Sequence, residues 1–391
     1  MDFKLTPEQK EFGKELDAYL RAHIKPDLNT ERLKFGHSAQ GPIYKKFIRQ
    51  MGKDGWLGIG WPEEYGGKGK TPLEQHIFFE ICEYHDVLLP VMALNAVGPT
   101  LMKFGSDEQK KAILPRTLAG DMEIAIGYTE PEAGSDLLAL KLSAVRDGDE
   151  YVLNGQKIFT TNAHLADYLW LAARTDPNAK KKHHGISVFL FPMDTPGISI
   201  QPMELIGEGR NNCTYYDDVR VPASAMVGEE NKGWTYITSQ LNLERIALAP
   251  ASPIRRNIEE VTQWAKETRI NGSYVIDRPS VKRTLANLFV EVDVLKMLNY
   301  QTAWMVTEGL QPFAESSALK AYGTQLAVET AYKLHEVLGL YGQLTEHSKW
   351  APLHGRIESA LKRTLIPIFG GGAMEVQKNI IALAGLGMPR G

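Results

Sequence analysis

Hydrophobic positions change their spacing twice along this chain of 391 residues, from helical to alternating and back to helical. The first helical pattern begins at Thr6–Glu8, where an N-cap residue, a proline at the first helical position and an acid follow one another. Phe12, Leu16 and Leu20 then recur every four residues, which is the spacing of one helix face. We therefore expect an N-terminal helical domain over residues 1–120.

An alternating pattern replaces the helical one at about residue 121. Residues 144–155 contain two alternating runs on either side of an Asp-Gly dipeptide, which is the strongest short signal for a β-hairpin. Similar runs predict further strands at 168–174, 186–191 and 214–221. A β domain is therefore expected over residues 121–230.

Helical spacing returns after Gly233 and continues almost to the end of the chain. One apolar helix face is particularly regular: it comprises Leu285, Leu288, Val292, Leu295 and Leu298. We expect a C-terminal helical domain over residues 231–391. The order of helical, β and helical domains predicts the α+β class.

Composition excludes several kinds of protein. The net charge is only −3 and the basic residues are scattered, so nucleic-acid binding is not expected. Cys82 and Cys213 are the only cysteines and belong to no pairing motif, which argues against disulfides and zinc and predicts two small buried side chains. The N-terminal residues lack a signal-peptide pattern, and no apolar stretch is long enough to span a membrane. We expect a cytoplasmic protein without a metal site.

Two polar segments of the β domain have the composition of a ligand site. Residues 126–136 combine glycines with the hydroxyls of Thr129 and Ser135, so the backbone can approach an anion or a planar ring closely. Residues 154–162 place an aromatic side chain beside two threonines at the end of a hairpin strand. From their residues alone, the first segment is interpreted as a turn in preference to a ligand site, and the second as an ordinary sheet edge. The basic cluster at 180–184 is interpreted as a solvated loop.

In this order and spacing, the two segments resemble the acyl-CoA dehydrogenase family. The resemblance extends over nearly the whole chain and implies a helical domain, a β-barrel-like domain, a C-terminal four-helix bundle and an FAD cofactor. The other matching segments are Leu5–Gln9, Pro62–Gly67, Gly105–Lys110, Asp218–Pro222 and Gly228–Glu229.

The resemblance assigns flavin-binding roles to residues of both segments. Thr129 is expected to hydrogen-bond the pyrimidine side of the flavin, Phe159 to pack on the isoalloxazine ring, and Thr161 to lie near N5. Ser135 is expected to contact either the FAD phosphates or the acyl-CoA. The expected cofactor-binding set is Tyr128, Thr129, Ser135, Phe159, Thr160 and Thr161.

The family's reaction removes the α proton of a thioester while the β hydride passes to the flavin, so it requires a carboxylate base. In many members this glutamate lies in a C-terminal turn, but here that position is Gly371, whose N–H could still serve the thioester carbonyl. Glu375 in the same turn has the wrong offset. Glu244 instead matches the glutamate of the isovaleryl- and long-chain-type enzymes. Without the resemblance, it would be interpreted as a solvated or ion-paired helix residue.

The resemblance also places Asn242 and Arg245 beside the CoA arm, whereas their residue types alone are compatible with a solvated helix surface. The substrate-binding set is therefore Ser135, Asn242 and Arg245. The electron acceptor implied by the family is an electron-transfer flavoprotein or a similar protein.

Two segments with which family members grip a neighbouring subunit's FAD depart from the pattern. The first is residues 268–279, where a proline falls near the position of a glutamine. In the second, Glu336 replaces an amide and Leu340 replaces a glycine, so a carboxylate would repel the pyrophosphate and a side chain would block its approach. We therefore expect an α2β2 hetero-oligomer with a related subunit.

The sequences of the matching segments resemble those of actinobacterial subunits that dehydrogenate steroid side-chain CoA thioesters. The resemblance implies a role in steroid catabolism, such as that of cholesterol. Two alternatives remain open: a non-catalytic partner subunit, and a flavin oxidase or monooxygenase on the same fold.

Overall fold

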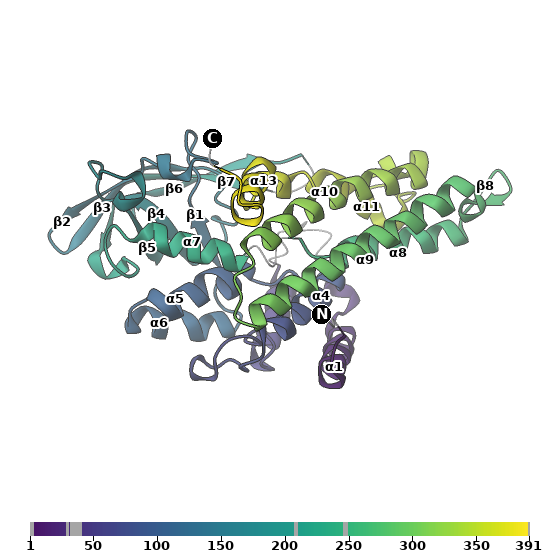
Figure 1. The fold of residues 1–391 in the computed structure, drawn as a ribbon, viewed down its shortest axis with the longest axis horizontal. Helices are drawn as coiled ribbons and strands as arrows, with labels where there is room; N and C mark the ends of the chain where they lie inside the picture. Colours follow the sequence, from purple (N-terminus) through teal and green to yellow (C-terminus); the bar gives the residue numbers. More distant parts are fainter. Residues whose placement is uncertain (1–3, 29–30, 32–40, 207–209, 245–248, 390–391) are drawn as a thin grey trace. The chain divides into compact units, whose positions relative to one another are not determined.

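The computed structural model describes residues 4–28, 31, 41–206, 210–244 and 249–389, and of residues 242–244 only the backbone. The described chain forms two compact units (Figure 1). The sheet unit comprises residues from 26–70 and 89–244, and the helical unit those from 1–25, 71–88 and 245–391.

A seven-stranded mixed sheet forms the centre of the sheet unit, in the order β1-β4-β2-β3-β7-β6 with β5 paired to β4. Strand β4 pairs in parallel with β1 and β2, whereas the other neighbours are antiparallel. The strands are β1 (Ile124–Gly127), β2 (Ser143–Asp147), β3 (Glu150–Lys157), β4 (Tyr168–Arg174), β5 (Ile186–Pro192), β6 (Ile198–Glu204) and β7 (Arg210–Pro222).

The predicted hairpin is confirmed as β2 and β3, with Gly148 at a φ of 64° in its turn. The register of β3 against β7 shifts between Leu153 and Gly155, which marks a β-bulge. Gly155 has a φ of 140°, and a Cβ there would lie 3.0 Å from the Cα of Leu142. The bulge therefore requires a glycine.

Helices of the sheet unit are α3 (Pro42–Lys53), α5 (Gly98–Phe104), α6 (Asp107–Leu118) and α7 (Gly233–Glu244). Ser106 caps α6 in a capping box with Gln109, so this polar turn is a helix start. Helix α7 packs along β5 (Figure 1). It places the end of α7 in the same compact unit as the two predicted flavin segments.

The helical unit contains α1 (Pro7–His23), α4 (Pro72–Tyr84), α8 (Ser252–Glu267), α9 (Pro279–Thr307), α10 (Phe313–Leu338), α11 (Arg356–Arg363), α12 (Ile366–Phe369), α13 (Met374–Ile380) and the short hairpin β8 (Arg269–Ile270) and β9 (Ser273–Tyr274). Thr6 and Thr71 cap α1 and α4 in capping boxes, and the former confirms the predicted helix start. The predicted apolar face on α9 joins the core of the unit, with Leu298 partly buried at its edge.

The α+β class and the order of helical, β and helical segments are confirmed. Cys82 is buried as expected, whereas Cys213 is only half buried because it points to the opposite face of β7 from its fully buried neighbours Asn212 and Thr214. Strand β6 was not predicted. Within the described residues, no helix is long and apolar enough to cross a membrane.

Candidate active site

The first predicted flavin segment begins where β1 ends. The carbonyl of Thr129 accepts a hydrogen bond from the Ile158 N–H at 2.8 Å, and Glu130 and Ala133 exchange two backbone bonds of 3.1 Å. These bonds hold the segment as a tight loop against the end of β3. Among the described residues, the hydroxyls of Thr129 and Ser135 have no hydrogen-bond partner, so both are available to a ligand.

A buried ion pair between Lys157 and Glu130 anchors this loop to the end of β3. The Nζ of Lys157, whose side chain is 0% exposed, lies 2.8 Å from Oε1 of Glu130 and donates to the Tyr128 carbonyl at 3.1 Å. The Glu130 carboxylate also accepts the N–H groups of Lys141 and Leu142, at 2.7 and 2.9 Å. Burial lowers the pKa of Lys157 to about 8, although the neighbouring Glu130 opposes this shift.

The second predicted segment presents an aromatic ring to solvent. Phe159 has a φ of 56°, a conformation that a bulky residue adopts only under constraint, and its side chain is 51% exposed. The constraint comes from buried Thr160, whose N–H and C=O each form a 3.0 Å hydrogen bond with Asn212 and whose hydroxyl lies 3.2 Å from that of Thr214. Thr160 therefore holds the backbone so that Phe159 points outward.

Thr161 follows at the exposed end of the segment. Its hydroxyl accepts a hydrogen bond of 3.3 Å from Nδ2 of Asn211 on β7. Sequence reasoning missed Asn211 and Asn212, although two adjacent amides at the start of a strand beside an expected hairpin were a usable signal.

Tyr128 connects the first segment to α7. The Nε1–H of Trp170 on β4 donates to the Tyr128 hydroxyl at 2.7 Å, and this hydroxyl hydrogen-bonds Oε1 of Gln240 on α7. The chain of side chains thus joins β1, β4 and α7 around the start of the flavin segment. Gln240 was not singled out from the sequence.

Helix α7 ends at Glu244. The backbone of Asn242 and Glu244 is helical, but their side chains and the whole of Arg245 lie outside the described residues. The assigned roles of these three residues therefore stay predictions.

The helical unit contains the other predicted position, Gly371, in the turn before α13. Gly371 and Gly372 have φ values of 68° and 96°, and a Cβ on Gly372 would lie 2.6 Å from Nε2 of Gln377. The turn is fixed by Gln377, which donates to both glycine carbonyls at 3.1 and 3.3 Å, and by Lys320, which donates to the Gly372 carbonyl at 2.7 Å. In the described chain the Gly371 N–H has no partner, which leaves it available as a donor.

The two segments that depart from the family's FAD grip also lie in the helical unit. Arg269 on β8 stacks on the ring of Tyr274 on β9, with 4.3 Å to the ring centroid, and donates to its hydroxyl at 3.2 Å. This interaction turns Arg269 toward its own hairpin. Glu336 lies near the end of α10, and the side chain of Leu340 is 81% exposed.

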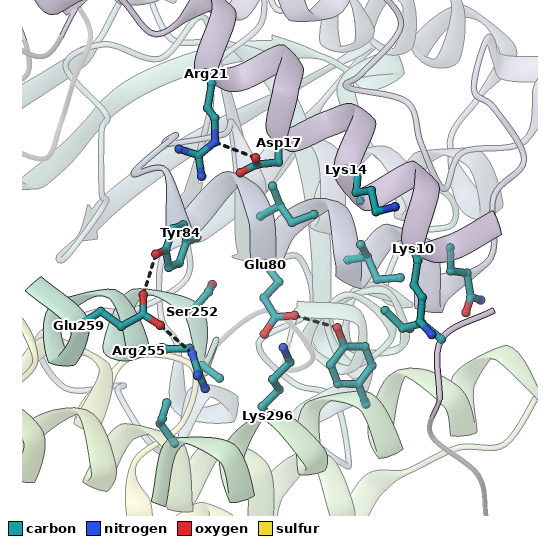
Figure 2. Close-up of a pocket in the computed structure, with 18 residues that line it drawn as sticks. Lys10, Lys14, Asp17, Arg21, Glu80, Tyr84, Ser252, Arg255, Glu259 and Lys296 are labelled. Carbon is teal, nitrogen blue, oxygen red and sulfur yellow. Dashed lines mark hydrogen bonds and ion pairs between the residues drawn. The ribbon is translucent and has the colours of Figure 1, made fainter. Parts of the chain in front are cut away.

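A cavity of about 660 Å³ lies in the helical unit between α1, α4, α8 and α9 (Figure 2). The Tyr84 hydroxyl donates to Glu259 at 2.6 Å, and Arg255 pairs with Glu259 at 3.0 Å. Tyr300 donates to Glu80 at 3.1 Å. Much of the polar lining is thus internally paired, and none of the active-site residues assigned from the sequence whose side chains the structure describes lines this cavity.

Comparison with known families identifies the class. Models for the N-terminal, middle and C-terminal domains of acyl-CoA dehydrogenases match residues 6–121, 125–217 and 231–386. The chain belongs to the acyl-CoA dehydrogenase family and is an oxidoreductase of that kind.

Several relatives match this chain over its full length. It is 46% identical to acyl-CoA dehydrogenase FadE29 and 43% identical to acyl-CoA dehydrogenase FadE26, both of Mycobacterium tuberculosis, with 100% of this chain and 99% of each relative covered. Among solved structures, it is similar to a chain of the ChsE4-ChsE5 complex from the same organism, with a TM-score of 0.93, 43% identity and full coverage of both chains. A chain of the Tcur3481-Tcur3483 steroid acyl-CoA dehydrogenase also has a TM-score of 0.93, with 42% identity and full coverage of both chains.

Proposed function

We propose that this chain is the base-bearing subunit of an FAD-dependent acyl-CoA dehydrogenase, with Glu244 as the base. One observation carries the proposal: the exposed, constrained Phe159 and the open Thr129 hydroxyl lie in the same compact unit as the helix that ends at Glu244. No such placement is required if Glu244 is merely a solvated helix residue.

The sheet-unit residues fit a flavin. A planar, partly apolar ring can pack on Phe159, while the unpartnered Thr129 hydroxyl can bond its polar edge. Thr161 offers a second hydroxyl next to the aromatic ring, and Ser135 offers one at the far end of the loop, where a phosphate or the CoA arm can bind. Tyr128 and Thr160 serve by holding these groups in place.

FAD, when bound, supplies the acceptor for the β hydride. Glu244 removes the α proton, a role that requires a carboxylate shielded from water. Negative charge that develops on the thioester oxygen needs fixed donors, and the unpartnered N–H of Gly371 is proposed as one of them. Asn242 and Arg245 are proposed to hold the CoA arm.

We also propose that the working enzyme is an α2β2 hetero-oligomer acting on a steroid side-chain CoA thioester. Arg269 is engaged by Tyr274, and Glu336 and Leu340 stand where an amide and a glycine are expected, so this chain lacks an evident grip on a second FAD. The names of the similar solved structures, one a steroid enzyme and one a two-component complex, support the same proposal. An electron-transfer flavoprotein or a similar protein is the proposed acceptor.

Glu244→Gln in the co-expressed complex tests the assignment of the base. We expect the anaerobic rate of flavin reduction by acyl-CoA to fall by about 10²- to 10⁴-fold, the usual contribution of a general base, with unchanged FAD content. Glu375→Gln is the matched control and should retain activity. Normal turnover by the Glu244 variant would refute the proposal and favour the non-catalytic subunit.

A panel of CoA thioesters from straight-chain to steroidal identifies the substrate class. We expect the steroid side-chain thioester to give the highest kcat/KM with an artificial electron acceptor. Peroxide release in air that equals this anaerobic turnover would instead identify an oxidase.

A further inference from the structure

Lys320 on α10 is a buried cation without a counter-charge. It is 0% exposed, and within the described residues no carboxylate pairs with its ammonium group. Burial accordingly lowers the pKa of Lys320. Proteins almost never bury a lysine completely without such a pair, because a buried charge is costly, so this lysine is expected to have a specific use.

The ammonium group binds backbone carbonyls around the turn before α13. Its Nζ donates to the Gly372 carbonyl at 2.7 Å and, more weakly, to the Ile368 carbonyl at 3.4 Å. Helix α13, which follows the turn, packs on α10 (Figure 1). The two carbonyl dipoles partly solvate the charge of Lys320 but do not neutralise it, so the buried side of the turn carries a positive charge.

A second side chain already holds the same turn without any charge. The Gln377 amide donates to the carbonyls of Gly371 and Gly372 at 3.1 and 3.3 Å. Both Gln377 and Lys320 bind carbonyls, and they leave the Gly371 N–H without a partner among the residues that the structure describes. Since a neutral amide can hold this geometry, the additional property that Lys320 brings to the turn is its charge.

We propose that Lys320 is a positioning residue for the oxyanion site: it fixes the turn that presents the Gly371 N–H to the thioester oxygen, and its charge stabilises the negative charge that develops there. This inference rests on the proposed function of Gly371. When the α proton passes to the base, the electron pair of the broken C–H bond is delocalised onto the thioester oxygen. A buried positive charge nearby lowers the free energy of this enolate more than that of the neutral substrate.

Lys320→Met tests the proposal in the co-expressed complex, because methionine fills a similar space without a charge or a donor. The probe is the CoA thioester that turns over fastest in the panel, used with and without deuterium at the α carbon. We expect kcat to fall by about 10- to 100-fold, with little change in KM because the bound substrate is neutral. The α-deuterium isotope effect on kcat should increase because proton removal becomes slower.

A CoA thioester with sulfur in place of the β carbon isolates the enolate, since it has an α proton but no β hydride to transfer. Its enolate, bound against oxidised flavin, gives a long-wavelength absorption band that measures how much of the bound analogue is ionised. We expect ionisation to be about tenfold less favourable in Lys320→Met, which is a shift of one pKa unit for the analogue. A purely structural lysine would change the FAD content but not the ionisation per bound flavin.

Lys333→Met is the matched control on α10, since Lys333 pairs with Glu291 at 3.3 Å instead of binding the turn. It should leave kcat, the isotope effect and the ionisation of the analogue unchanged. Lys320→Gln, which keeps a donor but lacks the charge, gives the same comparison if the methionine variant does not assemble. It should show the same loss of ionisation.

The two proposals fail in different ways. Unchanged kcat, isotope effect and ionisation in an assembled Lys320 variant would overturn the positioning role alone, and so would a loss of FAD with normal ionisation per bound flavin. A parent complex that neither oxidises any CoA thioester of the panel nor ionises the analogue would overturn the proposed function, and the role of Lys320 with it.

Discussion

At the residue scale, the Lys157–Glu130 ion pair of the sheet unit has both of its charges buried. Lys157 is fully buried, and the Glu130 carboxylate accepts two backbone N–H groups in addition to the lysine. Removal of one charge leaves the other buried without a counter-charge, which is the most damaging change that such a pair can suffer.

We therefore predict that Lys157→Met destabilises the assembled enzyme by about 3–5 kcal/mol and releases FAD, because the loop that bears Thr129 loses its anchor. Thermal melting and the flavin content after gel filtration measure the two effects. The double variant Lys157→Met with Glu130→Gln should be more stable than Lys157→Met alone. A double variant that is as unstable as the sum of the single variants would show that the pair is not coupled.

At the scale of elements, the sequence predicted those parts of the fold that depend on local patterns. The hairpin of β2 and β3 was recognisable because an Asp-Gly turn separates two alternating runs, and the start of α1 because Thr6, Pro7 and Glu8 supply an N-cap, a proline at the first helical position and an early acid. Strand β6 was missed although Ile198 and Ile200 pack against the core of the sheet and alternate with exposed residues, because this alternation is short and is interrupted by Pro202.

The candidate site was only partly predictable for a related reason. Thr129 and Phe159 were identified through segments that are local in sequence. Gln240 was missed because its partner Tyr128, which also accepts a hydrogen bond from Trp170, is distant along the chain and meets it only through the packing of β1, β4 and α7. The likeness of a single chain to a family does not show such long-range contacts.

Glu83 on helix α4 is expected to make the stability of the protein depend on pH. Burial, with a smaller effect of nearby Glu80, raises the pKa of Glu83 from 4.5 to about 8, and its Oε2 has no hydrogen-bond partner in the described structure. The folded state therefore holds a proton that the unfolded chain releases above pH 4.5. The contribution of neutral Glu83 to stability is full below pH 4.5 and is lost as the pH rises from about 4.5 to about 8.

Glu83→Gln should remove this dependence, since glutamine stays neutral at every pH. We expect the variant to melt at a higher temperature than the parent at pH 8 and at nearly the same temperature at pH 4.5. Glu11→Gln, which changes an exposed acid on α1, should leave the dependence as it is. If the melting temperatures of the parent and of the Glu83 variant changed with pH in the same way from pH 4.5 to pH 8, the raised pKa of Glu83 would be contradicted.

At the scale of the whole molecule, the altered FAD-binding segments determine which oligomer retains the cofactor. We predict that the chain purified alone retains little FAD, whereas co-expression with the related subunit gives an α2β2 complex with bound flavin. Native mass spectrometry and the flavin absorbance per chain measure both. A stable homotetramer with one FAD per chain would refute the hetero-oligomer.

A variant that restores the expected residues should increase FAD retention by the isolated chain. Glu336→Gln combined with Leu340→Gly removes a repulsive carboxylate and an obstructing side chain from the proposed phosphate contact. The isolated double variant should retain more FAD than the isolated parent chain, measured by equilibrium dialysis. Equal retention would place the defect elsewhere, with Arg269 and its hairpin as the next candidates.

The division of the chain between the two units has a consequence for its biosynthesis. The sheet unit is complete once the ribosome has passed residue 244, so it can fold while translation continues. Helices α1 and α4 are made early, but α8 and α9, against which α4 packs, come later. The face of α4 that packs on α8 and α9 must therefore stay uncovered until these helices are made, and a ribosome that stalls before α9 leaves a product that cannot cover it fully.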